Sequence, residues 1–77
     1  MDPQQALRRA YVQVAREFKF EADKIVRRQA SRERLLQLFG PQQTQLGWSD
    51  DDVFDHLINW RKQHKLPTLH EILASEN

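Results

Sequence analysis

The sequence predicts an all-α protein, a small bundle of three to four helices in a single domain over residues 1–77. Apolar residues recur at helical spacings of three and four, and no segment shows the period-two alternation of a strand. Proline, glycine and capping residues divide the chain into helical segments. The chain has no cysteine, so no disulfide can support a core that at this size contributes only about 3–5 kcal/mol. Packing or a partner must stabilise it.

The first predicted element is a long amphipathic helix over residues 3–29. Asp2 is a suitable N-cap, and Pro3 suits the first helical position. Such a helix would be about 40 Å long. The apolar side chains that form one stripe along it are Leu7, Tyr11, Val14, Phe18, Ala22 and Ile25.

This apolar register fails in the segment "RRQASRER", before it resumes at Leu35. A kink or short turn near Ala30–Ser31 is therefore the preferred interpretation, and one unbroken helix is the alternative. A short helix over residues 32–39 follows the kink. Gly40 and Pro41 are typical of a helix end, which predicts a loop over residues 40–48.

Two capping patterns define the last two helices. Ser49 with Asp52 predicts the start of a helix over residues 50–64, and Thr68 with Glu71 predicts the start of a helix over residues 69–75. Acidic residues in the first turn of the former also complement the helix dipole.

The stretch "VFDHLINWRKQHKLPTLHEIL" resembles the first two helices of winged-helix bacterial repressors. The residues that carry the resemblance are Val53-Phe54-Asp55, Pro67-Thr68 and Glu71-Ile72. It covers roughly twenty residues, and none remain after it for a recognition helix or a wing. We interpret it as a shared way of building a capped corner between two helices.

No pattern of catalytic or metal-binding residues stands out. Asp50, Asp51 and Asp52 are consecutive, so on a helix they point in different directions and are better explained as capping residues. The three histidines lack the spacing that places two ligands on one helical face, and the serines lack a neighbouring base. The sequence therefore predicts a protein that is not an enzyme and that needs no metal or cofactor.

No apolar run approaches the roughly 20 residues of a membrane-spanning helix, and the start "MDPQQALRRA" lacks the apolar core of a secretory signal. We therefore expect no membrane association and an intracellular location, cytoplasmic or nuclear.

Charge divides unevenly along the chain, although the net charge is only +1. Nine lysines and arginines face five acidic residues in residues 1–39, which gives +4, and three face six in residues 40–77, which gives −3. Opposite the apolar stripe, the first helix carries a basic row that could contact phosphates or an acidic protein surface. Its members are Arg9, Arg16, Lys19 and Arg27, with Arg34 beside them if the helix continues.

The predicted first helix is longer than the later helices can cover, so part of its stripe should stay exposed in a single copy. Exposed apolar rows commonly mark an interface. We therefore expect a non-enzymatic helical protein-binding module, a regulator or adaptor that docks on a larger protein or forms a homodimer. The expected contact residues are Leu7, Tyr11, Val14, Phe18 and Ile25, with Phe20 as a possible anchor on the basic side. The alternative is a nucleic-acid-binding protein that uses the basic row.

Overall fold

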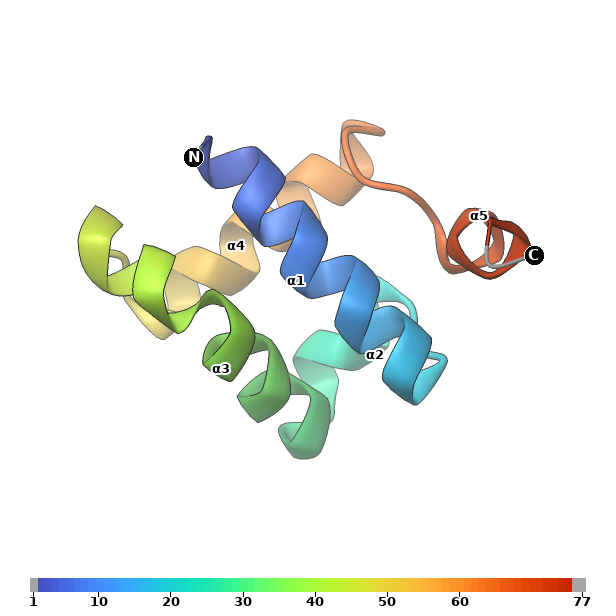
Figure 1. Cartoon of the computed structure of the whole chain (residues 1–77), viewed down its shortest axis with the longest axis horizontal. Helices are drawn as coiled ribbons and strands as arrows, with labels where there is room; N and C mark the ends of the chain where they lie inside the picture. The colour runs from blue at the N-terminus through green and yellow to red at the C-terminus, as the bar shows by residue number, and fades with distance from the viewer. Residues whose placement is uncertain (1, 76–77) are drawn as a thin grey trace.

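The computed structural model describes residues 2–75, which contain five α-helices and no strand. The helices pack into a body of 35 × 24 × 20 Å. In Figure 1, α4 crosses behind α1, and α5 lies at the edge of the molecule, joined to α4 by an extended segment. The all-α class is confirmed, but the predicted number of three to four helices is too small. The helices are α1 Pro3–Phe18, α2 Ala22–Arg27, α3 Gln29–Leu46, α4 Asp50–Lys62 and α5 Leu69–Ala74.

Helix α1 starts where the sequence predicts but ends much earlier. The Asp2 side chain accepts a hydrogen bond from the Gln4 amide, and Pro3 opens the helix. Lys19 then adopts the left-handed conformation, with φ of 60°, and its amide donates to the Ala15 carbonyl. The predicted helix over residues 3–29 is therefore wrong beyond Phe18.

Tertiary packing explains this early end, because no glycine or proline lies nearby. A continued helix would carry Ile25 about 10 Å beyond Phe18 along the axis. The turn instead brings α2 back against the body of the protein, where Ile25 and Ala22 are buried. Burial of a side chain such as Ile25 contributes roughly 1.5–3 kcal/mol, which offsets the roughly 1–2 kcal/mol cost of one left-handed residue.

A second break separates α2 from α3 at Arg28, whose backbone is extended. A break in this region was predicted, but two to three residues later, near Ala30–Ser31. Ser31 lies inside the first turn of α3 and is fully buried. Its hydroxyl lies 2.9 Å from the carbonyl oxygens of both Ile25 and Arg28. It therefore supplies a donor to the Ile25 carbonyl near the end of α2, and it adds a second contact to the Arg28 carbonyl, which also accepts from the Arg32 amide.

Helix α3 runs through Gly40 and Pro41, so the predicted end at these residues and the loop over residues 40–48 are both wrong. Pro41 has no amide hydrogen to donate to the carbonyl of Gln37 four residues earlier. Gln37 is exposed, so water can serve that carbonyl and the helix can continue. The helix ends at Gly47, with φ of 70°, where the left-handed conformation favours glycine.

Both predicted capping boxes are confirmed. The Ser49 hydroxyl accepts from the Asp52 amide while the Asp52 carboxylate accepts from the Ser49 amide, and Thr68 and Glu71 form the same reciprocal pair. The two helices end at Lys62 and Ala74, slightly before the predicted ends.

One hydrophobic core joins the helices. It takes residues from all five helices and from the segment before α5, and its largest fully buried side chains are Tyr11, Phe39, Leu7, Ile25, Leu35, Leu57, Val14 and Val53.

Candidate binding groove between α1 and α5

The apolar stripe that the sequence predicts as a docking surface is the core of the protein. Leu7, Tyr11, Val14 and Ile25 are each 0% exposed in a single copy. The expectation was that part of this stripe stays exposed, and it is wrong for these four residues, whereas Phe18 keeps part of its surface exposed. That expectation assumed a single first helix over residues 3–29, too long for the later helices to cover. The chain turns after Phe18 instead, and α2 and α3 fold back and cover α1.

Phe18 and Phe20 are only partly buried, and they pack on each other at the corner after α1. Their ring centroids lie 5.6 Å apart, and the ammonium group of Lys24 lies 4.7 Å from the Phe20 ring. Phe20 therefore has partners within its own chain. Its predicted role as an anchor for another protein gains no support from this packing.

The predicted basic row is divided among several elements. Arg9 and Arg16 lie on the exposed side of α1, whereas Lys19 ends that helix. Arg27 is exposed on α2, and Arg34 on α3 pairs with Glu17. The break after Phe18 therefore leaves only Arg9 and Arg16 in line on one helix.

These two arginines line an open groove of about 1020 Å³ between α1 and α5. Val12, Pro67 and Ile72 contribute apolar surface to the groove, and arginines and glutamines contribute polar surface. Ile72 is almost fully buried, while Val12 and Pro67 keep part of their surface exposed. The complete set of lining residues is Gln5, Arg8, Arg9, Val12, Gln13, Arg16, Glu17, Pro67, Glu71, Ile72 and Ser75.

A hydrogen bond from the core side of α1 holds the segment that leads into α5, which forms one wall of the groove. The Tyr11 hydroxyl, on the core side of α1, donates a hydrogen bond of 2.8 Å to the carbonyl oxygen of Pro67. Burial raises the pKa of Tyr11, and nearby Arg61 acts in the opposite direction, so the hydroxyl keeps its proton at neutral pH. With Ile72 buried against α1, this bond fixes the segment that leads into α5.

The acidic side chains of the groove have polar partners within the described chain, whereas two of its arginines do not. Within residues 2–75, the side chains of Arg8 and Arg9 have no hydrogen bond or ion pair, and both are exposed. The two carboxylates of the groove are already engaged, since Glu71 caps α5 and Glu17 pairs with Arg34. The groove therefore presents positive charge without an internal counter-charge near the start of α1.

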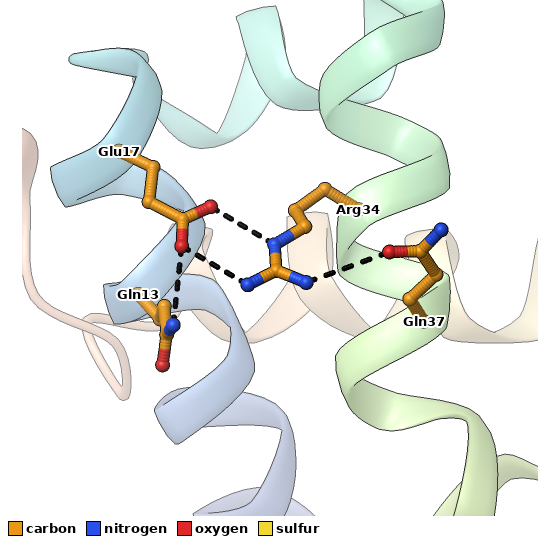
Figure 2. Close-up of polar contacts among 4 residues, drawn as sticks. All are labelled: Gln13, Glu17, Arg34 and Gln37. Carbon is orange, nitrogen blue, oxygen red and sulfur yellow. Dashed lines mark hydrogen bonds and ion pairs between the residues drawn. The ribbon is translucent and has the colours of Figure 1, made fainter.

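Glu17 forms a polar cluster with Gln13, Arg34 and Gln37 on the surface (Figure 2). Its carboxylate accepts two hydrogen bonds from the Arg34 guanidinium, at 3.0 and 3.2 Å, and one from the Gln13 amide at 3.1 Å. These hydrogen bonds lower the pKa of Glu17, and the bond from Arg34 has the largest effect. The Glu17 carboxylate in turn raises the pKa of Arg34. Arg34 also contacts Gln37 on its own helix, which helps to orient the guanidinium.

A second cluster, of aromatic rings, lies where α3 meets α4, and sequence reasoning did not identify it. His56 stacks on Trp48 with ring centroids 4.1 Å apart, and Trp60 meets His56 edge-on at 5.1 Å. The Nδ1 atom of His56 lies 2.7 Å from the Asp52 carbonyl, so it must carry a proton and donate. Phe39 joins the cluster to the core. These contacts explain how the end of α3 attaches to α4.

In the part of the chain that the structure describes, no group of three or more histidine or acidic side chains is arranged to hold a metal ion. Among the same residues, no helix is both long and apolar enough to span a bilayer.

Comparisons with models of protein families, with curated proteins and with solved structures found no match for this chain.

Proposed function

We propose that this protein is a small helical binding module, and that the groove between α1 and α5 takes up an acidic segment of a partner protein. The observation that carries this proposal is the pair Arg8 and Arg9, which line the groove beside an apolar patch and have no counter-charge within the described chain.

A protein segment suits the groove because it can combine two kinds of side chain. Carboxylates would meet Arg8 and Arg9, whose guanidinium groups form charge-assisted and bidentate hydrogen bonds with such partners. An aliphatic or aromatic side chain would cover Val12 and Pro67, and burial of one such side chain contributes about 1.5–3 kcal/mol.

Nucleic acid is the less favoured ligand, because a polyanion offers no apolar side chain to cover Val12 and Pro67. It would also meet the carboxylates of Glu17 and Glu71, which line the same groove. A second copy of the chain is also less favoured, because the reason for a homodimer was an uncovered part of the stripe, and Leu7, Tyr11, Val14 and Ile25 are buried in a single copy.

The groove suits a short segment. From Gln5 to Glu17 the α1 side of the groove spans about 18 Å, which corresponds to about three turns of a helix or about five residues of extended chain. We assign it a binding role without catalysis, because its carboxylates are engaged in hydrogen bonds and its hydroxyl, from Ser75, donates to the Ile72 carbonyl.

Selection from a random peptide library on the immobilised protein tests the proposal. We expect enriched peptides to combine Asp or Glu with an aliphatic or aromatic residue. Their affinity should fall at least about tenfold in the Arg8→Glu/Arg9→Glu variant, since two attractive charges become repulsive.

The matched control is Arg27→Glu/Arg28→Glu, which changes the same total charge at another exposed pair of neighbouring arginines outside the groove. It should retain the affinity. Selected peptides without acidic residues, equal loss in both variants, or tighter and salt-sensitive binding of a DNA or RNA duplex would each refute the proposal.

A further inference from the structure

Glu17 lines the groove, but the residue that neutralises it does not. Arg34 belongs to α3, is not one of the residues that line the groove, and reaches Glu17 from the facing helix (Figure 2). We propose that Arg34 is a specificity-determining residue of the groove, which favours acidic ligands because it holds the Glu17 carboxylate in a neutral pair. This inference rests on the proposed function.

The pair is well suited to this role. The guanidinium and the carboxylate meet through two parallel hydrogen bonds, of 3.0 and 3.2 Å, which fixes their orientation as well as their charge. Both side chains are 36% exposed, so neither is needed to fill the core. Gln13, also in the groove, donates to the same carboxylate and strengthens its attachment to the wall.

Arg34 changes the charge that a ligand meets. Three arginines and two glutamates line the groove, a net charge of +1, and the guanidinium of Arg34 beside Glu17 raises the local charge to +2. Without Arg34, Glu17 would stand at the edge of the groove as an uncompensated anion. An acidic ligand group about 8 Å away would then bind about two- to threefold more weakly in water at low salt.

The experiment uses a fluorescein-labelled synthetic peptide of about twelve residues built from Glu and Leu, matched to the groove length derived above. Anisotropy at low ionic strength gives its affinity for the intact protein and for Arg34→Gln, Glu17→Gln and the double variant Glu17→Gln/Arg34→Gln. The same peptide with Gln in place of Glu is the uncharged control. Circular dichroism and thermal melting confirm that each variant is folded.

We expect Arg34→Gln to weaken binding of the acidic peptide about two- to threefold. The double variant should recover the affinity of the parent, because the groove again has a charge of +2, and the uncharged peptide should not distinguish the four proteins. Recovery in the double variant is the decisive result, since a merely structural role for Arg34 would leave it as weak as Arg34→Gln.

An unchanged affinity in Arg34→Gln, or a double variant as weak as Arg34→Gln, would overturn the inference while the proposed function stands. Absence of binding by the parent protein to any acidic peptide would overturn the proposed function and the inference with it.

Discussion

The two halves of the molecule form their corners by different means. In the C-terminal half, α4 and α5 each begin with a side chain that bonds a backbone amide three residues later, at Ser49 and Thr68. In the N-terminal half, the breaks at Lys19 and Arg28 have no such cap at the next helix start. They are held by buried contacts instead, chiefly Ile25 and Ser31. Local hydrogen bonds therefore fix the later corners, and long-range packing fixes the earlier ones.

Ser31 gives the largest expected effect in this comparison. In Ser31→Ala the Ile25 carbonyl oxygen loses its buried hydroxyl donor, whereas the Arg28 carbonyl keeps the Arg32 amide, and the loss should cost about 1–3 kcal/mol. Urea denaturation measures the loss. The control is Ser75→Ala, which removes a similar bond to a carbonyl at an exposed position and should cost under about 0.5 kcal/mol. Equal costs would show that the α2–α3 corner does not depend on this buried hydroxyl.

This difference also explains which elements the sequence predicts. The starts of α1, α4 and α5 follow from residues within one turn of each other, so Asp2, Ser49 and Thr68 identify them correctly. The breaks at Lys19 and Arg28 depend on which side chains reach the core after the chain turns. The interrupted apolar register in "RRQASRER" indicates a break near Arg28 without fixing its position, and no local signal marks the break at Lys19.

The two glycines show the same limit. Gly40 with Pro41 resembles a helix end, yet α3 continues through both, and the helix ends at Gly47, the glycine that adopts a positive φ.

Only one side of the groove could be predicted from the sequence, for a related reason. Arg9 and Arg16 follow from the helical projection of α1, but Pro67 and Ile72 join them only because α5 folds back onto that helix.

The capping residues should give a smaller and more local effect. Ser49→Ala and Thr68→Ala each remove one bond to a helix amide, and each should cost about 1 kcal/mol. Hydrogen exchange should show a difference between them. Loss of the Thr68 cap should raise exchange in α5 alone, because this helix of six residues lies at the edge of the molecule (Figure 1). Faster exchange throughout the protein would show that α5 is coupled to the whole fold.

The smallest expected effect concerns the link between α1 and α3 through Glu17 and Arg34. Hydrogen bonds from Arg34 and Gln13 lower the pKa of Glu17 in the folded protein, so its contribution to stability is present above the unfolded pKa. That contribution should disappear as the pH falls through the folded pKa. Arg34 stays charged across this range and adds no pH dependence of its own.

The measurement is the difference in unfolding free energy between the parent and Glu17→Gln, followed from pH 7 downward. We expect the difference to shrink below about pH 4.5, near the ordinary pKa of a glutamate. In the Arg34→Gln background the same comparison should be nearly independent of pH, because the first cause of the shift is gone. A pH-dependent difference that survives Arg34→Gln would assign the shift to Gln13 and would show that Arg34 does not control the charge of Glu17 at the edge of the groove.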